Sequence, residues 1–359
     1  MGEVDQALNY YQQTLNLCPT EDEEELVSIY HHFGMLKANT REIDQAIALY
    51  NQSLELYERT DNLQGKAATL QQLGIIYAKK GEVDEAIALY NQSLSIKERI
   101  GDVQGKAATL HCLGVIYANK GDVDEAIAFY NQSLSIKERI GDVQGKAATL
   151  NNLGIIYANK GEVEEAIALF NKSLEIKERI GYVQGKAATL HQMGIIYASK
   201  GEVEQAIKLY NQSLEINKRI GYVQGKAATL HCLAGIYANK GELEQAIKLY
   251  NQSLEITQRI GYVKGKVATL HRLASIYANK GEVDKAIALF NQSLEINERI
   301  GNVQGKAMTL WLLGHLAEQQ GEYTKAISYL QPALEILQRL KSPDAESVSA
   351  SLDRIIRNS

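Results

Sequence analysis

The chain is dominated by an internal repeat of 40 residues. One clean copy, residues 141–180, reads GDVQGKAATLNNLGIIYANKGEVEEAIALFNKSLEIKERI. Two series of glycines, offset by 20 residues, mark the period: Gly81, Gly121, Gly161, Gly201, Gly241, Gly281 and Gly321, and then Gly101, Gly141, Gly181, Gly221, Gly261 and Gly301. Glycine just past a helix can adopt the left-handed conformation, so each unit is predicted to contain two helices. A fixed period in this range is the signature of a solenoid.

Both segments of the unit have the spacing of an amphipathic helix. The apolar positions of the first segment are Leu150, Leu153, Gly154 and Tyr157, and those of the second are Val163, Ala166, Ile167, Phe170 and Leu174. Neither face can be buried within its own helix. Pairing the two helices and stacking each pair on its neighbours buries both faces.

The motif Leu-Gly-x-x-Tyr-Ala at 153–158, followed by Ala166 and an aromatic residue at 170, resembles the tetratricopeptide repeat. The sequence departs from that pattern in having Leu150 at the usual tryptophan position, no proline at the end of the second helix, and 40 residues in place of 34. Longer units of this kind resemble Pins-like, kinesin-light-chain-like and bacterial arrays. The resemblance implies an all-α fold, an α-solenoid in which antiparallel helix pairs form a right-handed superhelix.

The repeat pattern predicts one array over residues 1–359. Residues 1–20 align with the second helix of the unit and are predicted to be an orphan second helix of a truncated repeat, so more protein is expected upstream. Residues 21–340 are predicted to form eight helical hairpins. Ser342 and Pro343 then suit the start of a C-terminal capping helix over 341–359.

The charge pattern argues against a nucleic-acid partner. The net charge is −5, and both signs alternate along the helices without a concentrated basic surface. No leader or long apolar run indicates export or a membrane span. The three cysteines, Cys18, Cys112 and Cys232, are not placed to bridge and suit a reducing compartment, so a cytoplasmic location is expected.

Three motifs invite a chemical interpretation that their context does not support. Gly-x-x-x-Gly-Lys-Ala, as at 101–107, lacks the spacing, the Ser/Thr and the preceding strand of a phosphate-binding loop. The Asn-Gln-Ser glycosylation sequon lies in mid-helix. His111, His191, His231 and His271 occupy equivalent positions, about one helix-packing distance apart, which is too far to share a metal. We therefore expect no enzyme activity, no metal and no cofactor.

In the family that the chain resembles, the first helices line the concave side of the array. At 100° per residue, the residues near Ala148 on that side form a predicted peptide-binding groove. Its candidate residues are Gln144, Asn151, Ile155, Asn159, Gln184, His191, Ile195, Gln224, His231, Asn239, Lys264, His271 and Asn279. Amides donate and accept hydrogen bonds at once, so they suit the backbone of an extended peptide.

The leading hypothesis is a protein-interaction scaffold that holds an extended peptide or a partner domain in this groove. The alternative is a sensor or regulatory array of a larger signalling protein that contains a nucleotide-driven switch or a caspase-like protease. A carboxylate clamp of the chaperone-binding kind is not expected, because one of its positions holds Ile75, Val115 or Ile155.

Two further points are left open by the residues. The repeated asparagines and histidines can also be copies of one ancestral unit without a ligand. The replacement of Ile155 and Ile195 by Gly235 and Ser275 marks either ligand discrimination or drift, as does the appearance of Tyr182, Tyr222 and Tyr262.

The apolar stripe of the orphan helix, which contains Leu8 and Tyr11, predicts self-association through that end.

Overall fold

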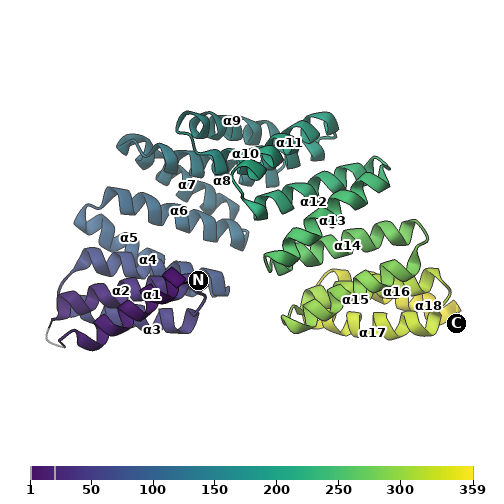
Figure 1. Cartoon of the computed structure of the whole chain (residues 1–359), viewed down its shortest axis with the longest axis horizontal. Coiled ribbons are helices and arrows are strands. Elements are labelled where there is room, and N and C mark those ends of the chain that lie inside the picture. The colour runs from purple at the N-terminus through teal and green to yellow at the C-terminus, as the bar shows by residue number, and fades with distance from the viewer. Residues whose placement is uncertain (1, 20–21, 359) are drawn as a thin grey trace. The chain divides into compact units, whose positions relative to one another are not determined.

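A computed structural model of the chain describes residues 2–19 and 22–358. Within these ranges all regular structure is helical, and from residue 23 onward consecutive helices are joined by tight turns (Figure 1). This confirms the predicted all-α class and its helix pairs. The contacts divide the chain into two compact units, Met1–Gly181 and Tyr182–Ser359, and each is described by itself.

The helix bounds follow the glycine series closely. Unit 1 contains α1 (Gly2–Leu17), α2 (Glu23–Asn39), α3 (Ile43–Arg59), α4 (Leu63–Lys80), α5 (Val83–Ile100), α6 (Val103–Lys120), α7 (Val123–Ile140), α8 (Val143–Asn159) and α9 (Val163–Arg179). Unit 2 contains α10 (Val183–Ser199), α11 (Val203–Arg219), α12 (Val223–Asn239), α13 (Leu243–Arg259), α14 (Val263–Asn279), α15 (Val283–Arg299), α16 (Val303–Gln319), α17 (Tyr323–Arg339) and α18 (Asp344–Asn358).

Each even-numbered helix from α2 to α16, called here a first helix, packs against the odd-numbered second helix that follows it. The two approach closely where a small residue of the first helix meets a large side chain of the second. At Gly114, for example, an added Cβ would lie 2.7 Å from the ring of Tyr130. Within each unit, the second helix also packs on the first helix of the next hairpin.

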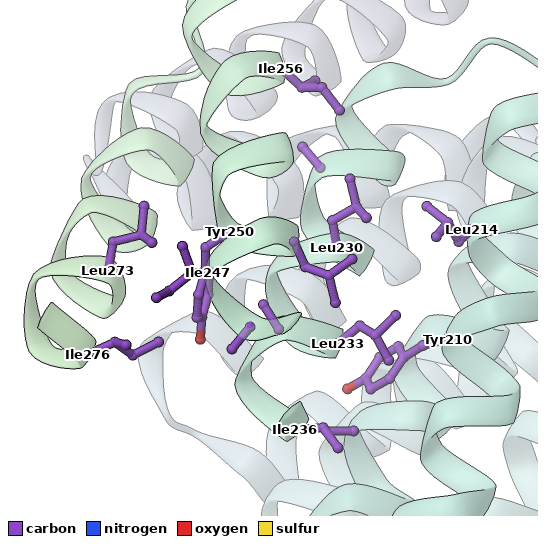
Figure 2. Close-up of a cluster of buried hydrophobic side chains, with 14 of the residues drawn as sticks. Tyr210, Leu214, Leu230, Leu233, Ile236, Ile247, Tyr250, Ile256, Leu273 and Ile276 are labelled. Carbon is purple, nitrogen blue, oxygen red and sulfur yellow. The ribbon is translucent and has the colours of Figure 1, made fainter. Parts of the chain in front are cut away.

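The buried core therefore runs from one hairpin into the next. In unit 2, one cluster joins Tyr210 of α11, Leu233 of α12, Tyr250 of α13 and Ile276 of α14 (Figure 2). Every one of these side chains is buried. Apolar burial of this kind stabilises at roughly 25 cal/mol per Å², so the contacts between hairpins add to the stability that each hairpin gains from its own helix pair.

The buried serine of the Asn-Gln-Ser motif has a structural role. Ser133 is fully buried, and its hydroxyl donates to the carbonyl of Ala107 on the paired first helix at 2.7 Å. Ser93, Ser213 and Ser253 make the equivalent bond, each to the residue 26 positions earlier, as does Ser173 of the related Asn-Lys-Ser sequence. Hydrogen bonding to the paired helix accounts for the repeated serine in this motif.

The N-terminal helix, α1, packs on α2 and is only partly covered. The ring of Tyr11 stacks on Phe33 with centroids 6.0 Å apart, and Leu15 joins a small core cluster. Val4 and Tyr10 are exposed. Self-association through this end stays a prediction.

Within the described residues no helix combines the length and the apolar character needed to cross a membrane.

The turn that closes each helix from α2 to α17 contains a residue in the left-handed conformation. In the turn after α12, Gly241 has φ = 79°, its N–H donates to the carbonyl of Ala238, and Glu242 N–H donates to the carbonyl of Tyr237. Lys341, which closes α17, adopts φ = 53° without being glycine. A side chain in this conformation costs about 1 kcal/mol or more.

We therefore expect Gly241→Ala to destabilise the protein by about 1 kcal/mol and Lys341→Gly to stabilise it by a similar amount. Urea titration followed by circular dichroism measures both. If the two substitutions shift the midpoint in the same direction, the left-handed conformation is not what these positions require.

Candidate functional site

The predicted groove residues divide between the two units. Gln144, Asn151, Ile155 and Asn159 lie on α8 in unit 1, and the other nine lie on α10, α12 and α14 in unit 2. The four residues Gln144, Gln184, Gln224 and Lys264 are exposed, as are Asn159, Asn239 and Asn279. Asn151, Ile155 and the three histidines are half-buried.

Unit 1 has a hollow of about 220 Å³ between α6 and α8. Val115, Ile155 and Tyr130 form its apolar lining, and Asn119 and Asn159 lie among its polar residues. Asn152 also faces it, but the amide of that residue donates to Tyr130 Oη and to His111 Nε2, both at 3.3 Å. Of the four predicted residues on α8, Ile155 and Asn159 line this hollow.

Unit 2 has a larger hollow of about 500 Å³ along α10, α12 and α14. Four predicted residues line it: Ile195, His231, Asn239 and Asn279. Its lining includes Gly235 and Ser275 at the two positions where the sequence replaces isoleucine by a small residue. The hydroxyl-bearing rings of Tyr210 and Tyr250, drawn in Figure 2, line it as well.

The other predicted residues of unit 2 lie outside this hollow. Lys264 lines a separate hollow of about 210 Å³ between α12 and α14, together with Tyr262. Gln184, Gln224, His191 and His271 line neither of the two.

The histidines, three of which the sequence predicted for the groove, connect successive hairpins. His111 Nδ1 lies 3.0 Å from Thr149 Oγ1, and the His111 ring meets Tyr130 edge-on. The hydroxyl of Thr149 donates to the carbonyl of Gly145, so it accepts from the imidazole N–H. The same pairing joins His31 to Thr69, His191 to Thr229, His231 to Thr269 and His271 to Thr309.

Burial keeps these imidazoles neutral. Burial, and to a lesser extent the nearby Lys137 ammonium, lowers the pKa of His111 to about 4. Burial similarly lowers the pKa of His191 to about 4 and the pKa of His231 below its usual range. Their ring nitrogens are used between repeats, so the asparagines are the better candidates for contact with a ligand.

The sequence interpretation missed Cys232, Arg272 and the two tyrosine hydroxyls. Cys232 and Arg272 occupy the position directly after the histidine, where other repeats have Gln72, Cys112, Asn152 and Gln192. The arginine at this position was a usable signal, because the equivalent residues carry no such charge. The tyrosines belong to second helices, and the angular positions of residues on the first helices give no information about them.

No group of three or more His, Cys, Asp or Glu side chains that could hold a metal ion occurs in the described part of the chain.

The sequence profile of the tetratricopeptide repeat family matches residues 25–99, 105–179, 145–219, 185–259, 225–299 and 266–339. The chain belongs to the tetratricopeptide repeat family. A search of curated proteins returned no match.

Solved structures of other repeat proteins share the fold. The apo form of the quorum sensor NprR from B. thuringiensis is 17% identical, with a TM-score of 0.65 and coverage of 94% of both chains. A Rap protein in complex with the Competence and Sporulation Factor is 15% identical, with a TM-score of 0.59 and coverage of 94% of this chain and 98% of that one.

The STAND protein PH0952 from Pyrococcus horikoshii, described as having a tetratricopeptide repeat sensor, is 16% identical with a TM-score of 0.65. The match covers 98% of this chain and 54% of that one.

The buried histidines predict a loss of stability in mild acid. Between pH 6.5 and about 4 the unfolded chain binds protons that the folded His111 does not, so the free energy of unfolding falls as the pH falls through this window. The contribution of His111 at pH 5 is on the order of 1–2 kcal/mol. We expect the urea midpoint to be lower at pH 5 than at pH 7.

His111→Gln should reduce this pH dependence, because glutamine can still hydrogen-bond Thr149 and does not titrate; Gln71 occupies the equivalent position in another repeat. Urea titrations of both proteins at pH 5 and 7 measure the difference. An unchanged pH dependence would show that this imidazole is solvated.

Proposed function

We propose that the chain binds an extended peptide segment of a partner protein along its first helices. The observation that supports this most strongly is the hollow of about 500 Å³ in unit 2, which is within the usual size of ligand sites. Its lining includes the small residues Gly235 and Ser275, two tyrosines, and Asn239 and Asn279, which lie at equivalent positions on successive first helices.

The repeat spacing fits an extended chain. Packed helices lie about 8–10 Å apart, and an extended peptide advances about 3.3 Å per residue. Amides 40 positions apart in this chain therefore lie within reach of peptide residues about three apart. Each amide can pair with a backbone N–H or C=O, which gives affinity without demanding one side chain.

The comparisons support the same class of function. The Rap protein is described in complex with the Competence and Sporulation Factor, and NprR is described as a quorum sensor. A sensor array within a larger protein is the second candidate, supported by the repeat sensor of the STAND protein. The two candidates are compatible, because a sensor can take a peptide as its signal.

Filling the hollow tests the proposal. A Cβ at position 235 would meet only the Tyr250 hydroxyl, at 3.4 Å, so a larger side chain can be built there without disturbing the backbone. Gly235→Leu also favours the helix by about 1 kcal/mol. We expect the double variant Gly235→Leu/Ser275→Leu to remain folded and to bind peptides at least tenfold more weakly.

The probe is a random dodecapeptide phage library selected on the full chain, with the selected peptides synthesised and titrated by fluorescence anisotropy. Lys226→Ala/Lys306→Ala is the matched control, since these lysines line neither hollow. His191 and His271 are left unchanged because they connect hairpins. Failure to select any peptide, or equal affinity for the filled variant, would contradict the proposal.

A further inference from the structure

The large hollow of unit 2 contains one charged side chain, Arg272 of α14. The remaining lining residues are apolar or neutral: His231 has a pKa lowered by burial, and burial raises the pKa of the Cys232 thiol. Arg272 is exposed, and no ion pair or hydrogen bond joins its guanidinium to any residue that the structure describes.

The equivalent residue in the hollow of unit 1 is used differently. The Asn152 amide donates to Tyr130 Oη and His111 Nε2, so it is already hydrogen-bonded within the protein. Arg272 has no such contact. A cation that lines a hollow and lacks an acidic partner is available to an anionic ligand, because a guanidinium has five donors in a planar arrangement.

The arginine coincides with two further changes in the same hollow. Gly235 and Ser275 replace the isoleucine or valine of other repeats, as in Val115 and Ile155. Position 235 has no side chain, and an added Cβ there would lie 3.4 Å from the Tyr250 hydroxyl, so this hydroxyl borders the hollow at that point although the tyrosine as a whole is buried. No residue in the described part of the chain hydrogen-bonds this hydroxyl. Four residues on three helices thus provide a cation (Arg272 of α14), room beside it (Gly235 of α12 and Ser275 of α14) and a second donor (Tyr250 of α13).

We propose that this hollow takes a carboxylate of the bound peptide, which pairs with the guanidinium of Arg272 and accepts a hydrogen bond from Tyr250. This rests on the proposed peptide-binding function and specifies one residue class within it. A single guanidinium matches one carboxylate, which it can hold with two parallel N–H···O bonds. Phosphorylated motifs are typically recognised by arginine clusters, which this hollow lacks.

The test is a double-mutant cycle on the full chain. Peptides selected from the random dodecapeptide library are synthesised with a fluorescein label, in four forms: as selected, with each Glu or Asp changed to Gln or Asn, with an amidated C-terminus, and with both changes. Each form is titrated against wild type, Arg272→Gln and Arg272→Lys. Arg219→Gln, at the exposed end of α11, is the control for loss of a surface charge.

We expect removal of one carboxylate to weaken binding to wild type about tenfold and binding to Arg272→Gln less than twofold. Arg272→Lys should show an intermediate loss, because lysine keeps the charge without the planar pair of donors. The control should behave as wild type. The form that responds identifies the source of the carboxylate, a side chain or the C-terminus.

The outcomes separate the two proposals. If no peptide binds any variant, the proposed function fails and the carboxylate site fails with it. Only the carboxylate site is overturned if peptides bind wild type equally well with and without the carboxylate. The same holds if removing the carboxylate weakens binding to Arg272→Gln as much as it weakens binding to wild type. Unchanged far-UV circular dichroism of Arg272→Gln excludes unfolding as the cause of a loss.

Discussion

The structure depends on the contact between one hairpin and the next. A pair of helices 17 or 18 residues long presents apolar residues on both sides, and only a neighbouring pair can cover the second side. The cluster of Tyr210, Leu233, Tyr250 and Ile276 shows this, because its members come from four successive helices. The hollow of unit 2 borders this contact, because Tyr210, Tyr250 and Ile276 belong to both.

The contact also takes up polar groups. The histidine–threonine pairs are formed between repeats. The buried serines of the second helices hydrogen-bond to the first helix of the same hairpin. A buried donor or acceptor without a partner costs about 1–3 kcal/mol. The hydrogen bonds between these residues therefore contribute to stability, and no ligand is needed to explain them. The asparagines at the ends of the first helices are exposed, and the requirement for stability does not account for them.

The sequence predicted the helices well because glycine and the apolar spacing are local signals. The left-handed glycines follow the helices as expected, and Gly154, one of the apolar positions of the first segment, packs against Phe170 of the second. The site was predicted less completely. Angular position placed Asn239 and His231 together on the first helix, but it could not show that the imidazole reaches Thr269 of the next hairpin. That distinction depends on side-chain direction and on the neighbouring repeat.

A second variation in the sequence has a structural explanation. Asp102 and Asp142 cap their helices and lie near the buried Lys97 and Lys137, whose pKa burial lowers. At the corresponding positions of unit 2, Asn217 and Thr257 replace lysine, and Tyr222 and Tyr262 replace aspartate. The tyrosine rings cover Gly225 and Gly265, where a Cβ would lie 2.5 Å from the ring. Lys177 stays buried in the repeat where Tyr182 already replaces the aspartate, so the buried lysine does not require an acidic neighbour, and the change to tyrosine concerns packing.

The change at Gly235 has no such compensation. The preceding residue, Ala234, takes the fully buried close-approach position that Gly154 occupies elsewhere, and Gly235 then stands where other repeats place isoleucine. Glycine in mid-helix costs about 1 kcal/mol relative to alanine, and the apolar contact of isoleucine is lost as well. What the change provides is the larger hollow, which the Tyr250 hydroxyl borders beside position 235. A local loss of stability that opens space beside an unpaired arginine is typical of a binding site.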